Sequence, residues 1–192
     1  MNKSQLTALE AINIAYEYIN ERNKYFVPWT IQGDINKSVQ YYEKFFALHG
    51  GAWVVEIDFV DFDKLLVISD EEKGISFLIF GIKRSKLSEI NTLLTIERVL
   101  EISRNYNDEY QIEGVINFNH GESIAFYERF EGVEGYTWAV NMKVPPSPFG
   151  GGDTVSLILS DEQACVAYMF DPSGYQVAPH LDDEDEDDED DE

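Results

Sequence analysis

The protein has 192 residues and a mass of 22.0 kDa, with 37 Asp and Glu against 14 Lys and Arg, which gives a formal net charge of −23. Hydrophobic residues make up 44% of the chain and aromatic residues 14%, which is enough for a buried core and excludes a wholly disordered protein. A surface this negative repels phosphates, which argues against nucleic acid and anionic membranes as partners.

The N-terminal segment predicts an amphipathic helix with Ser4 as its cap. Its apolar residues recur at helical spacing: Leu6, Leu9, Ile12, Tyr16 and Ile19. The segment lacks the continuous apolar stretch of a secretory signal, and no part of the chain approaches the roughly 20 apolar residues that span a bilayer. We therefore expect a cytoplasmic protein.

Short runs rich in aromatic and β-branched residues follow this helix and predict strands at 26–31, 41–47, 52–59, 65–68 and 75–80. Ser69–Gly74 has the composition of a hairpin turn between the last two.

The densest acidic clusters of the body lie in this region, at Asp58–Lys64 and Asp70–Glu72. Alternating carboxylates suit a calcium ion, but the central Gly and terminal Glu of an EF-hand loop are not in place here. Phe62 lies among the aspartates of the first cluster. An aromatic ring on an acidic loop is either an interface anchor or a residue that folds back onto its own core.

The stretch 82–88 is the most basic in the chain and either is solvated or lies against the acidic body. After it, Ser88 is the expected cap of a second helix that carries Ile90, Leu93, Ile96, Leu100 and Tyr106 at helical spacing. Further strands are predicted at 115–118, 123–130, 136–144, 155–159 and 165–170, with a hairpin turn at Ser160–Ala164. The single cysteine, Cys165, excludes an internal disulfide and is expected to be a buried thiol, because its neighbours are apolar.

The two halves repeat one unit. Tyr41–Phe45 (YYEKF) matches Phe126–Phe130 (FYERF) at an offset of 85 positions. The same offset aligns Gly50 with Gly135, Trp53 with Trp138 and Val55 with Val140. Leu66–Glu72 matches Leu157–Gln163 at an offset of 91, and the six extra residues fall in the Pro- and Gly-rich stretch 145–152.

We therefore expect an α+β protein made of two tandem copies of a helix packed on an antiparallel sheet of about four strands. The first copy is 1–81, the basic linker 82–88, the second copy 89–181 and a disordered acidic tail 182–192. Without the tail, 26 acidic and 14 basic residues still give a net charge of −12. Whether the two sheets pair at an edge is left open.

No motif in the sequence predicts catalysis or metal binding. His49, His120 and His180 belong to no metal-ligand cluster, and Gly150–Asp153 lacks the Lys and Ser or Thr of a phosphate-binding loop. We therefore expect no cofactor and no enzymatic activity. The alternative is a small-ligand-binding or enzymatic protein with a pocket between the two copies.

An acidic body without catalytic groups favours a binding protein for a basic partner. A nuclease must be basic to hold its polyanion, so an inhibitor can cover the same surface with an acidic face. A further alternative is a DNA mimic or a chaperone for basic proteins, in which the tail does the binding. The predicted partner-binding residues are Asp58, Asp61, Phe62, Asp63, Asp70, Glu71 and Glu72.

A helical opening at Ala8–Tyr18, the Trp-Xxx-Val strands Trp53–Val55 and Trp138–Val140, and a terminal hairpin occur in this order. The arrangement resembles small bacterial immunity proteins of polymorphic-toxin systems, and helix-on-sheet modules of the PepSY and cystatin types. This resemblance implies a helix-on-sheet fold and the neutralisation of a toxin, and it assigns no functional residue.

Overall fold

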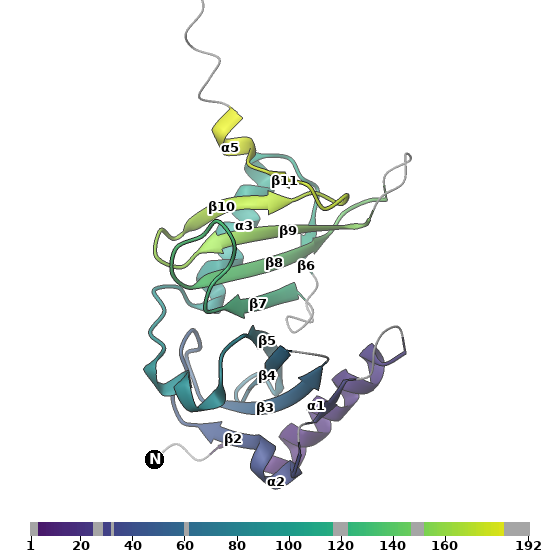
Figure 1. Ribbon diagram of the computed structural model, residues 1–192, viewed down its shortest axis with the longest axis vertical. Coiled ribbons are helices and arrows are strands. Elements are labelled where there is room, and N and C mark those ends of the chain that lie inside the picture. Colours follow the sequence, from purple (N-terminus) through teal and green to yellow (C-terminus); the bar gives the residue numbers. More distant parts are fainter. Residues whose placement is uncertain are drawn as a thin grey trace, which may run out of the picture.

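The computed structural model describes residues 4–24, 29–31, 33–59, 62–116, 123–146 and 152–182. They form an 11-stranded sheet in the order β1-β3-β4-β5-β7-β8-β9-β10-β11, with β2 also paired to β3 and β6 to β8 (Figure 1). The strands are β1 (Thr30–Ile31), β2 (Val39–Tyr42), β3 (Ala52–Phe59), β4 (Phe62–Ser69), β5 (Gly74–Phe80), β6 (Val115–Ile116), β7 (Ile124–Tyr127), β8 (Thr137–Lys143), β9 (Thr154–Ser160), β10 (Cys165–Phe170) and β11 (Gln176–Val177). The helices are α1 (Ala8–Arg22), α2 (Ile35–Ser38), α3 (Ile96–Glu109), α5 (Pro179–Asp182) and the 3-10 helix η1 (Arg84–Glu89).

The α+β class is confirmed, and the sheet is mostly antiparallel. Both halves place a long helix before strands in the same order, α1 before β1–β5 and α3 before β6–β10. The two predicted hairpin turns are also confirmed and use the same bonds. Ser69 Oγ accepts from Glu72 N in the first half, and Ser160 Oγ accepts from Gln163 N in the second.

Both long helices begin at a threonine, so the predicted serine caps are wrong. Thr7 accepts a hydrogen bond from Glu10 N while the Glu10 carboxylate accepts one from Thr7 N, which closes a capping box. Thr95 caps α3 by accepting a hydrogen bond from Arg98 N, without the reciprocal bond of a capping box. Ser88 lies inside η1, which takes up the residues that the sequence assigns to the start of the second helix.

The two halves are joined by a parallel pair, β5 with β7, in which Leu78 is opposite Ala125 and Ile79 opposite Phe126. Because strands alternate in direction within each half, a parallel pair at the junction reverses every strand of the second half relative to its counterpart. The order of strands along the sheet is unchanged. The second half is therefore turned over, and its helix must lie on the opposite face.

The buried residues confirm this arrangement. α1 covers one face of the first half, where it packs on Val55, Ile57, Leu66, Ile68 and Leu78. α3 packs on the other face, with Trp138 and Val140, and lies behind β7–β10 in Figure 1. Trp53 and Trp138 therefore each lie under the helix of their own half, and Trp138 is fully buried.

One hydrophobic core crosses the junction, so the structure does not show two separate sheets. The face of the first half away from α1 is continuous with the α3 face of the second half. The rings of Phe46 and Phe126 are 5.0 Å apart, and those of Phe77 and Trp138 are 5.3 Å apart. Each of these ring pairs joins residues from both halves.

The stretch 82–88 packs on this core and is not a free linker. Ile82 and Leu87 are 2% and 3% exposed. Two of its basic residues lie against acidic ones: Arg84 Nε is 3.3 Å from Glu56 Oε1, and Lys86 Nζ is 3.8 Å from Glu128 Oε1.

The outer strands of the sheet end differently. β2 pairs only with β3, so its other edge is open among the described residues. β10 is partly covered by β11, which pairs with Met169 and Phe170. Cys165 begins β10 directly after the hairpin turn and is exposed there, so the expectation of a buried thiol is wrong.

Candidate functional site

The acidic residues predicted to bind a partner do not form one surface. Asp58 is exposed near the end of β3 and pairs in register with Asp63 of β4, whereas Glu71 and Glu72 are exposed beyond the other end of β4. Seven residue steps along a strand separate the two groups by roughly 23 Å. Asp61 lies outside the described residues, as do the side chains of Phe62 and Asp63.

Asp70 belongs to the interior, which corrects its assignment to a binding surface. It is 6% exposed, and its carboxylate accepts hydrogen bonds from Gln5 N (2.8 Å), Leu6 N (2.9 Å) and Ser4 Oγ (2.7 Å). Burial alone would raise the pKa of Asp70, but these donors and the Trp53 indole hold it below its usual value. The Asp70 carboxylate therefore holds the segment that precedes α1 in place.

Asp161 does the same in the second half. It accepts from Leu93 N (2.7 Å), Leu94 N (3.1 Å) and Trp138 Nε1 (3.0 Å), and it is 1% exposed. Each half thus ties the turn between its last two strands to the residues that precede its helix. The sequence did contain a signal for this role. Asp70 and Asp161 occupy matching positions in the two repeats, as do Trp53 and Trp138, and a residue that only faces solvent would not need to recur together with a tryptophan.

The loop between β7 and β8 carries acidic residues that the sequence analysis did not single out. At the offset of 85, Phe46 corresponds to Glu131 and His49 to Glu134. Phe46 is apolar because it packs on Phe126 across the junction. The second half adjoins no third copy, so the corresponding position lies in solvent and holds a carboxylate.

This loop is held in place on the sheet. Phe130 and Val133 pack on the face opposite α3, and Val133 N donates to Phe130 O at 3.2 Å. The Tyr168 hydroxyl donates to the carbonyl of Glu131, and Gly132 lies against the Tyr168 ring. Burial, together with the Glu131 charge, raises the pKa of Tyr168, so its hydroxyl remains a donor at neutral pH.

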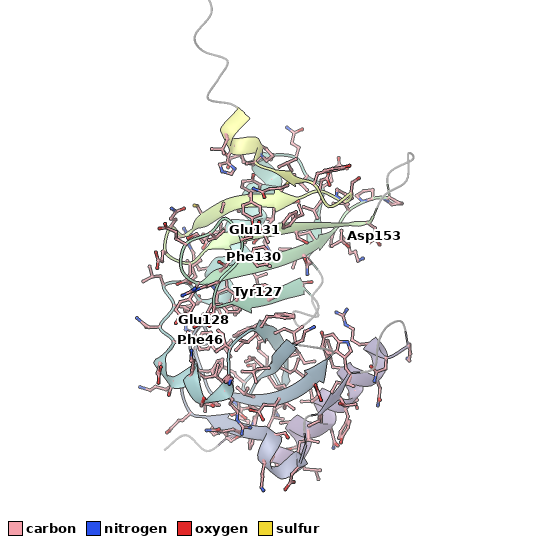
Figure 2. The ribbon with its side chains drawn as sticks, viewed as in Figure 1. Phe46, Tyr127, Glu128, Phe130, Glu131 and Asp153 are labelled. Atoms are coloured by element: carbon pink, nitrogen blue, oxygen red, sulfur yellow. The ribbon has the colours of Figure 1, made fainter. Side chains whose placement is uncertain are left out.

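Four glutamates at this end define what we call the acidic loop surface: Glu128, Glu131, Glu134 and Glu162. Glu162 lies beside Gly135, and Asp161 N donates to Tyr136 O at 3.0 Å, which joins the β9–β10 turn to the loop. All four are exposed, and Figure 2 labels Glu128 and Glu131 along the loop. Within the described ranges, no basic group lies within 4 Å of the carboxylates of Glu131, Glu134 or Glu162. The surface stays negative despite Lys86 and Arg129 nearby.

The potential catalytic groups of the described chain lie in separate contacts. His49 is 3.5 Å from Glu97, His180 Nδ1 is 3.1 Å from the Tyr106 hydroxyl, and the Cys165 thiol lies near Gln163. The described residues contain no group of three or more His, Cys, Asp or Glu that could hold a metal ion. His120 lies outside them, and so does Phe149. None of the helices that the structure describes has the length and apolar character needed to cross a membrane.

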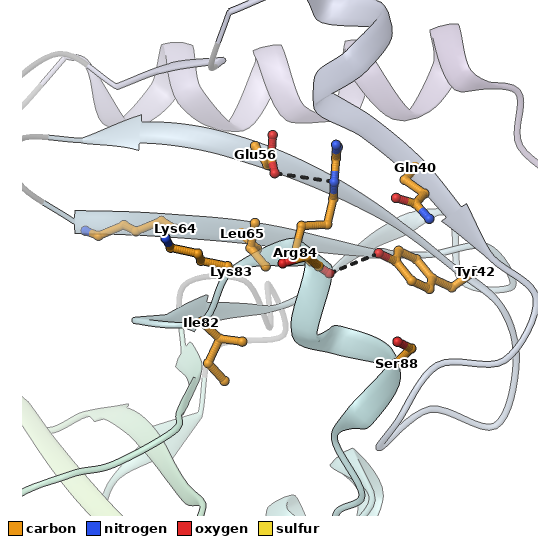
Figure 3. Close-up of a pocket in the computed structure, with 10 residues that line it drawn as sticks. Gln40, Tyr42, Glu56, Lys64, Leu65, Ile82, Lys83, Arg84 and Ser88 are labelled. Carbon is orange, nitrogen blue, oxygen red and sulfur yellow. Dashed lines mark hydrogen bonds and ion pairs between the residues drawn. The ribbon is translucent and has the colours of Figure 1, made fainter.

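A hollow of about 600 Å³ lies on the first half, between the sheet and the stretch 82–88 (Figure 3). Leu65 and Ile82 supply apolar lining, and Gln40 and Tyr42 line it from the open edge strand. Its charged residues are Glu56, Lys64, Lys83 and Arg84. The hollow is therefore formed by the sheet of the first half together with the stretch 82–88.

Comparison with known proteins assigns no family. No protein-family model matches the chain, and no curated protein matches it. Among solved structures, the C-terminal domain of Bacillus megaterium YpeB aligns with 90% of this chain at 8% identity and a TM-score of 0.29. The chain spans 65% of the length of that structure. At this score the similarity carries no inference about activity or partner.

Proposed function

We propose that this protein is a non-enzymatic cytoplasmic inhibitor of the immunity type, which binds a basic protein such as a nuclease toxin and covers its active surface. The observation that carries the proposal is the acidic loop surface. Its carboxylates are exposed and are mounted on a loop that the core holds in one position, and those of Glu131, Glu134 and Glu162 have no basic group within 4 Å among the described residues. Charges placed in advance bind a complementary surface without the cost of ordering a flexible loop.

The first test is charge reversal in the loop. A Glu131→Lys/Glu134→Lys variant should lose roughly tenfold or more in affinity for a basic candidate partner, such as a toxin domain encoded by a neighbouring gene, with most of the loss in the association rate at low salt. Glu17→Lys/Glu21→Lys on α1 changes the net charge equally and is the matched control, because both residues are exposed on the helix. Equal losses in the two variants would show non-specific attraction and contradict the proposal.

The second test separates this surface from the residues predicted from sequence. Glu71→Lys/Glu72→Lys alters the turn of the first half, and Asp58→Lys alters the far end of the same hairpin. If either variant abolishes binding while the loop variant does not, the partner binds the first half. Deletion of 183–192 should lower the association rate only; complete loss of binding would favour the acidic chaperone or DNA mimic instead.

A further inference from the structure

The hollow on the first half is a cationic site in an anionic protein. Lys64, Lys83 and Arg84 line it, against the single carboxylate of Glu56, and the Lys64 ammonium lies over the rings of Trp29 and Phe80, so Lys83 and Arg84 supply the charge of the hollow. Some basic residues elsewhere pair with acids, as Arg98 does with Glu101 and Lys143 with Asp153. Lys83 is exposed at the hollow, and no carboxylate of the described chain lies within 4 Å of its ammonium group.

Arg84 has hydrogen-bonding capacity that the chain does not use. Its Nε is held by Glu56 at 3.3 Å, and Tyr42 Oη donates to its backbone carbonyl at 3.5 Å. Its Nη1 is buried and has no hydrogen-bond acceptor among the described residues. In the view of Figure 3, the guanidinium lies between Glu56 and Gln40. A buried donor without an acceptor is costly, and a planar guanidinium is suited to carboxylate and phosphate oxygens.

The fold itself does not require these charges, as the second repeat shows. Gln40 corresponds to Ala125, Glu56 to Asn141 and Lys64 to Val155. In the second half, Asn141 accepts a hydrogen bond from Ser156 at 2.6 Å, and the position needs no ion pair. Glu56 and Lys64 are therefore charged only in the first copy of the unit, and Lys83 and Arg84 lie in the stretch 82–88 that joins the copies.

We propose that the hollow binds a small organic anion, a carboxylate or phosphate group carried on an apolar body. Arg84 and Lys83 hold the charged group, with Gln40 and Tyr42 beside it, and Leu65 and Ile82 contact the apolar part. Lys64 borders the hollow, while its ammonium lies over the rings of Trp29 (4.6 Å) and Phe80 (4.7 Å) and extends away from Arg84 in Figure 3. The site is separate from the acidic loop surface and independent of the function proposed for it.

Three probes that share a phenyl ring test the proposal on the full chain: benzoate, the neutral benzamide of nearly the same shape, and phenyl phosphate. Binding at millimolar concentration is followed by the backbone amide resonances of residues 82–88. Benzoate or phenyl phosphate should shift these resonances in a saturable way, and which of the two binds more tightly identifies the charged group. Benzamide should bind at least roughly tenfold more weakly, as expected when a charge-assisted contact is lost.

Variants decide whether the named residues hold the anion. Lys83→Gln should weaken binding roughly fivefold to tenfold, and because Lys83 is exposed and unpaired this change leaves the fold intact. Arg84→Gln/Glu56→Gln removes both partners of the ion pair and should abolish binding. Lys143→Gln, on β8, is the matched control and should bind like the wild type. Absence of saturable shifts, equal binding of benzamide, or no effect of Lys83→Gln would overturn the proposal.

Discussion

Two buried aspartates, Asp70 and Asp161, show why charge alone misled the prediction at the level of single residues. Both stand in hairpin turns next to exposed glutamates, and their sequence context looks like a solvated acidic cluster. Their backbone hydrogen-bond donors, which precede the two helices, lie 64 to 68 positions away in the chain. A contact over that separation leaves no local pattern, so burial of these carboxylates was not predictable from composition.

Removing the charge of Asp161 should destabilise the fold without affecting a binding surface. In Asp161→Asn one of the two acceptor oxygens becomes an NH₂ group, which leaves a buried N–H of Leu93, Leu94 or Trp138 without its partner. The free energy of unfolding should fall by about 2–4 kcal/mol, measured by urea denaturation. Glu162→Gln, one position along and exposed, should change it by less than about 0.5 kcal/mol. Similar values for the two variants would contradict the role assigned to Asp161.

Lys64 should make stability depend on pH in the alkaline range. Burial, with the nearby Arg22 charge, lowers its pKa to about 8 in the folded protein, while an unfolded lysine titrates near about 10.4. Between these values the unfolded chain holds the proton and the folded chain does not, so stability rises with pH. Relative to Lys64→Met, the wild type should gain on the order of 2 kcal/mol between pH 8 and 10. An unchanged difference between the two proteins over this range would show that Lys64 keeps its usual pKa.

At the scale of elements, the sequence predicted the types of structure better than their ends. Hairpins such as β4–β5 and β9–β10 were predictable, because alternating apolar residues and polar turns are local signals. The helix starts were displaced because Thr7 and Thr95 compete with nearby serines for the cap, and only tertiary contacts decide between them. A comparison of the two copies emphasises the residues that they share. The acidic residues of the β7–β8 loop that replace other residue types of the first copy therefore did not stand out.

Matched glycines in the two repeats allow a controlled test of the loop conformation. Gly135 has φ of +74°, and a Cβ there would lie 2.5 Å from Glu162 Oε1, whereas a Cβ on Gly50 would make only an ordinary contact of 3.5 Å with Glu71. Gly135→Ala should therefore cost about 1–2 kcal/mol of unfolding free energy, and Gly50→Ala should be close to neutral. Thermal denaturation measures both. Equal effects would show that the two loops do not differ in backbone conformation.

At the scale of the whole molecule, the shared core should make the protein unfold as one unit. Phe126 is fully buried, and its ring lies 5.0 Å from that of Phe46 and 4.6 Å from that of Trp138. Phe126→Ala should lower stability by about 3–5 kcal/mol and shift a single calorimetric transition. Tyr175→Ala, which removes a side chain that is 72% exposed, should have little effect. A transition that splits in two would instead show that the two copies predicted from sequence unfold independently.

The parallel junction itself was not predictable, because edge pairing leaves no motif in either strand. Leu78–Phe80 has the composition of any buried strand. The inversion of the second half can be deduced only once the neighbouring strand is known to run in the same direction. The two copies were correctly aligned from sequence, yet their relation in space depends on the β5–β7 pair and on the core contacts that cross it.

The outer edge of β2 occupies the position in the first copy that β7 uses in the second to receive β5. Each copy therefore has one edge formed by β2 or β7 and one edge formed by β5 or β10. The β5–β7 pairing joins edges of these two kinds, so the same pairing would allow further copies to be added. At the β10 edge of the sheet, β11 pairs with part of β10 and so blocks the addition of another strand there. The open edge of β2 has no such cover among the described strands, and a net charge of −23 on each chain opposes pairing between two such edges.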